Sequence, residues 1–128
     1  MIRVSGIPEL RTALEQARAL SMLGESEEAA SIALGAIPKF AGGHPTSAGR
    51  GYAIAAGIFG DLGEEDKAIE LYELAVETLP VADRHLVDVY TSLAVIHEER
   101  GNVPEQIRYL KLALEAKAVP VQRSRAEA

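Results

Sequence analysis

The middle of the chain, residues 52–80, has the sequence YAIAAGIFGDLGEEDKAIELYELAVETLP, in which a single glycine separates two helical segments. In the second segment, 64–79, apolar residues recur at i, i+3, i+4, i+7 and i+11, which is the spacing of one helix face. They are Ala68, Leu71, Tyr72, Ala75 and Leu79. The charged residues lie off this stripe, at Lys67, Glu70, Glu73 and Glu77. Residues 52–80 therefore predict two helices joined at Gly63.

The same arrangement recurs along the chain. Glycines suited to ending a helix stand at Gly24, Gly63 and Gly101, separated by 39 and 38 residues. Paired helices that repeat at such a period indicate a solenoid, in which each pair shares its core with its neighbours. We predict helices over about 8–22, 26–37, 47–62, 64–79, 84–100 and 104–118.

Turn and cap residues set the expected ends of these helices. Pro8 suits a first helical position, and the second helix is expected to stop before Pro38. Thr46 or Ser47 can cap the third helix, and Asp83 the fifth. No stretch alternates with a period of two, so the sequence predicts an all-α fold. We expect one domain over 1–118, with repeats at about 8–38, 46–80 and 83–118, and a flexible tail at 119–128.

Composition limits the classes of function. Asp and Glu number 19 against 13 Lys and Arg in 128 residues, so no broad basic face is available and nucleic acid is not an expected partner. The absence of cysteine excludes disulfides, thiolate metal sites and a cysteine nucleophile. No apolar run reaches the roughly 18 residues that span a bilayer, so membrane insertion is not expected. The first residues lack the apolar core of a signal peptide, and a cytoplasmic location is expected.

The repeats resemble the tetratricopeptide repeat (TPR) family, whose pattern is W-x2-L-G-x2-Y, then A-x3-F, then P. The middle repeat matches best, with Tyr52, Ala55, Ala56, Phe59, Gly63, Ala68, Tyr72, Ala75 and Pro80. The third repeat has Tyr90, Leu93, Ala94, His97, Gly101, Gln106, Leu110 and Ala113, with Ala118 in place of the proline. The first repeat is degenerate, with Ala13, Gln16, Ala17, Leu20, Gly24, Ala29, Ala33 and Ala36. The period also exceeds the family's value of about 34 residues. The resemblance implies a right-handed α-solenoid of three TPR-like helix-turn-helix repeats, six helices in all.

The resemblance implies binding. TPR proteins hold an extended peptide or a partner's helix on a concave face, which is lined by the first helix of each pair. Repeat one supplies by position Arg11, Leu14, Glu15, Arg18 and Met22. Repeat two supplies Arg50, Ala53, Ile54 and Gly57, and repeat three Asp88, Thr91, Ser92, Val95 and Glu98. A peptide with an acidic end, an apolar middle and a basic end would complement this lining.

One TPR subfamily is not expected. TPR domains that grip the C-terminal carboxylate of heat-shock chaperones use Lys and Asn in repeat one, Asn in repeat two, and Lys and Arg in repeat three. The corresponding residues here are Leu14, Arg18, Ile54, Asp88 and Ser92. Only Arg18 could pair with a carboxylate, and Asp88 would repel one.

Catalytic and metal-binding signals are weak. The three histidines show no i, i+4 pairing that indicates a metal site, and His97 is expected in the core. With no nucleophile–base pair visible, we expect neither an enzyme nor a cofactor. The first hypothesis is a protein- or peptide-binding module that acts as an adaptor or assembly scaffold. The alternative is a peptide-sensing regulatory domain, or a fragment of a larger regulator.

The last predicted helix carries two apolar lines. Ile107, Leu110 and Leu114 form one, while the other consists of Tyr109, Leu112, Ala116 and Val119. Both lines cannot face one core. Self-association through the second line is the leading interpretation, because solenoid ends need covering. Excision from a longer protein, or a tail that folds back, are the alternatives.

Overall fold

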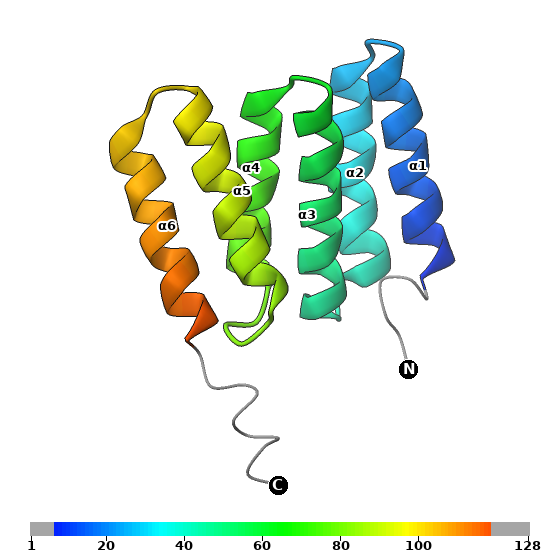
Figure 1. Cartoon of the computed structure of the whole chain (residues 1–128). Helices are drawn as coiled ribbons and strands as arrows, with labels where there is room; N and C mark the ends of the chain where they lie inside the picture. Colours follow the sequence, from blue (N-terminus) through cyan, green and yellow to red (C-terminus); the bar gives the residue numbers. More distant parts are fainter. Residues whose placement is uncertain (1–6, 119–128) are drawn as a thin grey trace, which may run out of the picture. The chain divides into compact units, whose positions relative to one another are not determined.

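The computed structural model describes residues 7–118, and all regular elements in this range are helices. They are α1 (Pro8–Met22), α2 (Ser26–Ala41), α3 (Pro45–Asp61), α4 (Glu65–Thr78), α5 (His85–Glu99) and α6 (Val103–Lys117) (Figure 1). The all-α class and the six helices are confirmed. The solenoid and its handedness stay predictions.

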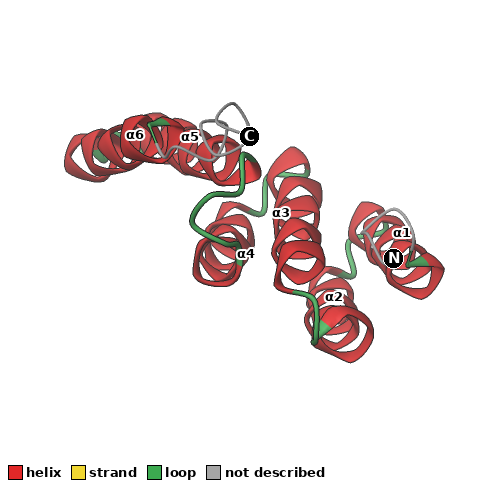
Figure 2. Ribbon diagram, turned by 90° about the horizontal axis from the view of Figure 1, so that it is seen from below, coloured by secondary structure: helices red, strands yellow, loops and turns green. Residues whose placement is uncertain are grey.

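The chain divides into two compact units, Met1–Thr78 and Leu79–Ala128, which we call unit one and unit two. Unit one contains the hairpins α1–α2 and α3–α4, and unit two contains the hairpin α5–α6. Within unit one, α1 and α2 both contact α3, so the second hairpin packs on the first (Figure 2).

The three hairpin turns share one backbone conformation. Gly24, Gly63 and Gly101 have φ values of 87°, 81° and 74°, in the left-handed region that favours glycine. After each glycine, the next N–H donates to a carbonyl five residues back, as from Glu64 to Phe59 at 2.8 Å. The glycine N–H donates three residues back, as from Gly63 to Gly60 at 3.1 Å. These two bonds form a Schellman motif, so the glycine repeat in the sequence corresponds to a repeated turn.

Two predicted helix ends are wrong and one cap is confirmed. Pro38 lies inside α2, which continues to Ala41 because Ile37 and Ala41 are fully buried while Pro38 is exposed. Neither Thr46 nor Ser47 caps α3; the helix begins at Pro45, whose missing N–H suits the first position. The carboxylate of Asp83 accepts a hydrogen bond from the backbone N–H of His85 at 2.8 Å, as expected of a cap for α5.

The interior of unit one combines a few large side chains with many small ones. The largest fully buried side chains of this unit are Phe59, Leu10, Ile37 and Leu71. Gly51 of α3 lies where the two hairpins meet, and a Cβ there would make ordinary van der Waals contacts with Ile37 Cγ1 at 3.4 Å and Leu10 Cδ2 at 3.5 Å. Of the stripe predicted for α4, Ala68, Leu71 and Ala75 are buried and Tyr72 is half-buried, while Leu79 lies beyond the end of the helix.

In unit two, α5 and α6 meet through aromatic rings. His97 is 8% exposed, which confirms its predicted core position, and its ring stacks on Tyr109. Tyr109 is itself only 4% exposed. The guanidinium of Arg108 lies 4.3 Å from the centroid of the Tyr109 ring and also donates to Glu105.

The prediction that α6 self-associates through the line of Tyr109, Leu112 and Ala116 is therefore wrong. Tyr109 is buried, with its ring stacked on His97 of α5, and Leu112 and Ala116 are half-buried. The other line is exposed: Ile107 is 47% exposed, Leu110 42% and Leu114 70%. Val119 lies outside the described residues.

Among residues 7–118, no helix combines the length and the apolar character needed to cross a membrane.

Candidate functional site

The residues predicted to line a concave face fall on α1, α3 and α5. On α1, Arg11, Glu15, Arg18 and Met22 are exposed, the last to 69%. Leu14 is 5% exposed, so its assignment as a lining residue is wrong. It shares a helix face with Leu10, Ala17 and Ser21, which are buried as well.

On α3, the predicted lining residues are less accessible. Ile54 is 44% exposed, whereas Arg50, Ala53 and Gly57 are half-buried. Because α1 and α3 pack together within unit one, their exposed residues belong to one compact body. We call the set Arg11, Glu15, Arg18, Met22 and Ile54 the α1–α3 face.

The remaining predicted lining residues belong to α5 in unit two. Asp88, Thr91, Val95 and Glu98 are exposed, and Ser92 is half-buried. The hydroxyl of Thr91 donates to the carbonyl of Val87 at 2.9 Å, so its proton is already engaged by the backbone. A groove that spans both units stays a prediction.

A second surface of unit one was not predicted. A groove of about 920 Å³ lies between α2 and α4. We call it the α2–α4 groove; it is lined by Glu27, Ala30, Ser31, Leu34, Gly35, Asp66, Lys67, Ile69, Glu70 and Glu73. The lining combines four carboxylates and one ammonium with small and apolar side chains.

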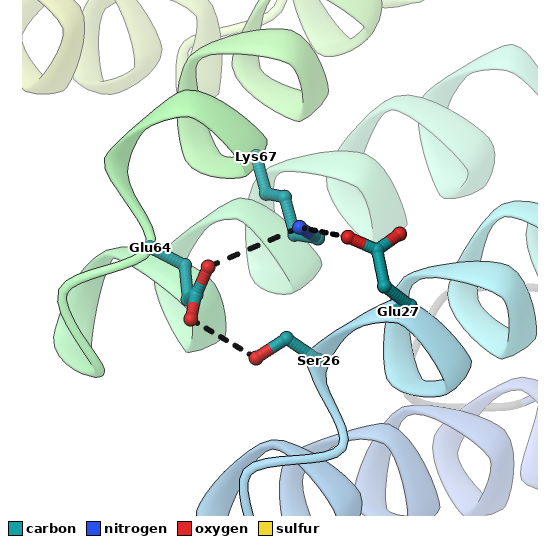
Figure 3. Close-up of polar contacts among 4 residues, drawn as sticks. All are labelled: Ser26, Glu27, Glu64 and Lys67. Carbon is teal, nitrogen blue, oxygen red and sulfur yellow. Dashed lines mark hydrogen bonds and ion pairs between the residues drawn. The ribbon is translucent and has the colours of Figure 1, made fainter.

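Polar side chains at the start of α2 and at or just before the start of α4 contact one another beside the groove (Figure 3). Lys67 Nζ donates to Glu27 Oε2 at 2.9 Å and lies 3.9 Å from Glu64 Oε1. Ser26 Oγ donates to Glu64 Oε2 at 3.0 Å. The hydrogen bond to Glu27 raises the pKa of Lys67, so this lysine is protonated at neutral pH. Its charge is therefore already matched by neighbouring carboxylates.

The sequence alone indicates only one wall of this groove. Asp66, Glu70 and Glu73 follow one line along α4, but such charges on an amphipathic helix are typical of a solvated face. The opposite wall comes from α2, about 35 to 40 residues earlier in the chain, which is one repeat period. Only the packing of one hairpin on the other brings the two walls together.

Among residues 7–118, no group of three or more histidine, aspartate or glutamate side chains is placed to hold a metal ion. Of the four acids of the α2–α4 groove, three lie along α4 and Glu27 lies on α2. Comparisons with family models, curated proteins and solved structures find no match to this chain.

Proposed function

We propose that this protein is a non-catalytic module that binds a protein or peptide and acts as an adaptor or assembly scaffold. The ligand lies on the α1–α3 face of unit one. The alternative is that the same surface senses a peptide as part of a regulator. The resemblance of the repeats to the TPR family agrees with either role.

The observation that carries this proposal is the exposure of large apolar side chains on α1 and α3, together with exposed charged side chains on the same line of α1 as Met22. Met22 and Ile54 expose 69% and 44% of their surface to water. Arg11, Arg18 and Glu15 are exposed on the same face. Apolar anchors bordered by charges are typical of protein interfaces, where burial supplies affinity and the charges select the partner.

The experiment compares partner capture by the wild-type chain with capture by two variants. Ile54→Glu places a charge on the apolar part of the face, and Arg18→Glu reverses its basic end. Partners identified from a source lysate are then purified, and their affinities are measured by calorimetry. Each variant is expected to weaken binding about tenfold or more, because a desolvated anchor or charge contributes roughly 1.4 kcal/mol or more.

Lys39→Glu is the matched control for Arg18→Glu, because it makes the same charge change at an exposed position on α2. It should leave affinity unchanged, and circular dichroism should show equal helicity for all variants. Binding that survives both Ile54→Glu and Arg18→Glu would overturn the assignment to the α1–α3 face.

A second proposed function is self-association through α6. Its exposed residues Val103, Ile107, Leu110 and Leu114 are spaced by four, three and four positions. This spacing is the same in both directions, so two antiparallel copies of α6 would match Val103 with Leu114 and Ile107 with Leu110. A two-fold interface requires self-complementarity of this kind.

The first hairpin shows how such a helix face is covered within unit one. Ala33 and Ile37 of α2 follow the turn glycine Gly24 by 9 and 13 residues. Leu110 and Leu114 of α6 follow Gly101 by the same numbers, so the two pairs are equivalent positions of the repeat. Both α2 residues are fully buried, and Ile37 lies beside Gly51 of α3. A second copy of α6 would give the exposed line of α6 the cover that α3 gives to α2.

A further inference from the structure

We propose that the α2–α4 groove binds a basic amphipathic helix of a partner protein. This surface is separate from the α1–α3 face, and the inference does not depend on a ligand there. The groove lies wholly within unit one, and its two walls differ in chemistry.

The wall formed by α4 is acidic. Asp66, Glu70 and Glu73 line the groove at spacings of four and three residues, which places them along one line of the helix. At 1.5 Å per residue, this line extends for about 10 Å. The one cationic side chain in the lining, Lys67, is bonded to Glu27. By formal charge the lining holds four carboxylates against one ammonium, and three of the four carboxylates are on α4.

The wall formed by α2 is small and apolar. Ala30, Leu34 and Gly35 line it, and Leu34 is 37% exposed. No atom lies within 4 Å of the position that a Cβ on Gly35 would occupy, so the groove is open at that point. Ile69 of α4 adds a half-buried apolar side chain. A ligand that fills the groove must present an apolar edge to α2 and a basic edge to α4.

The spacing of the acids favours a helical ligand. A helix that lies along α4 repeats its own side chains at the same rise, so Lys or Arg at i, i+4 and i+7 would stand opposite Asp66, Glu70 and Glu73. An extended peptide places successive side chains of one face about 6.6 Å apart, so three of them span about 13 Å, whereas the three acids span about 10 Å along α4. Phosphate-bearing ligands are repelled by the carboxylates, and residues 7–118 gather no metal-binding cluster there.

The test uses a designed, fluorescently labelled helical peptide as the probe. It carries lysine at i, i+4 and i+7 next to a stripe of leucine and alanine. A control peptide has the same composition, with the lysines distributed around the helix. Binding to the full chain is followed by fluorescence anisotropy. We expect the patterned peptide to bind more tightly than the control, and its affinity to fall when salt is raised.

Two kinds of variant separate the roles of the walls. Glu70→Lys combined with Glu73→Lys reverses the acidic wall and should weaken the patterned peptide about tenfold or more. Gly35→Leu leaves the charge unchanged but fills the open part of the apolar wall, and should also weaken binding. The matched control is Glu77→Lys, at an exposed position of α4 that does not line the groove. Glu77→Lys and Ile54→Glu should bind the peptide like the wild-type chain.

Either of two results would overturn the proposal. Equal binding of the two peptides would show attraction by net charge alone. A loss with Glu77→Lys as large as that of the double variant would place the peptide elsewhere on α4. All substituted positions are exposed, and circular dichroism verifies that each variant keeps its helices.

Discussion

The rings of His97 and Tyr109 stack with their centroids 5.6 Å apart and their planes inclined by 11°. This contact joins α5 to α6, and both side chains are almost fully buried. Tyr90 of α5 also approaches Tyr109, with a centroid distance of 6.2 Å. The core of unit two therefore depends on a small aromatic cluster, of which His97 is one member.

The stacked histidine acts through packing. Its Nδ1 is buried and has no hydrogen-bond partner among the described residues, which costs stability. His97→Phe keeps an aromatic ring and removes this buried polar atom, so the free energy of unfolding should be unchanged or higher. His97→Ala removes the stack and leaves a cavity, and should lower that free energy by about 2 to 3 kcal/mol. Urea unfolding, followed by circular dichroism, measures both. A phenylalanine variant as unstable as the alanine variant would show that the imidazole has a polar role.

Glycine substitutions should have opposite effects at two positions. Gly63 has φ of 81°, so Gly63→Ala forces an alanine into the left-handed region and should cost about 1 to 2 kcal/mol. Gly35 lies inside α2 with open space around its Cβ position, so Gly35→Ala should raise stability by about 0.5 to 1 kcal/mol. Thermal and urea unfolding of both variants provide the comparison. A neutral Gly63→Ala variant would contradict the importance of the left-handed turn.

Self-association should depend on the exposed line of α6. Ile107→Lys combined with Leu114→Lys places two charges at positions that are 47% and 70% exposed, so the fold should survive. Light scattering coupled to size-exclusion chromatography should give a dimer for the wild-type chain and a monomer for the double variant. Leu23→Lys is the control, because Leu23 is 78% exposed in the turn between α1 and α2. A wild-type chain that is monomeric at tens of micromolar would refute the proposal.

Local sequence signals predicted the helices well. The glycine period predicted the three turns, because each turn has a residue with positive φ and glycine adopts that conformation most easily. The stripe of Ala68, Leu71 and Ala75 predicted the buried face of α4. Helix ends were less predictable where tertiary burial outweighed a local signal. Pro38 is the example, since the burial of Ile37 and Ala41 extends α2 beyond it.

The functional surfaces were harder to predict, because exposure depends on contacts between helices. The helical pattern of α6 made both of its apolar lines candidates for burial, and only the packing of α6 on α5, in which Tyr109 stacks on His97, shows which line is buried. Leu14 was wrongly assigned to the binding face for a related reason. The assignment followed its position in the repeat, although Leu14 shares a helix face with the buried Leu10. The α2–α4 groove needs walls from two hairpins, so neither wall alone indicated it.

The repeated glycine turn also has a kinetic consequence. Each Schellman turn returns the chain directly onto the helix it has just completed, so the principal packing partner of every helix is its neighbour in sequence. Chains whose contacts are this local have low contact order and fold on a timescale of roughly microseconds to milliseconds, far faster than sheet proteins of similar size. Each hairpin can thus nucleate on its own, and the route to the native state does not require distant segments to meet first.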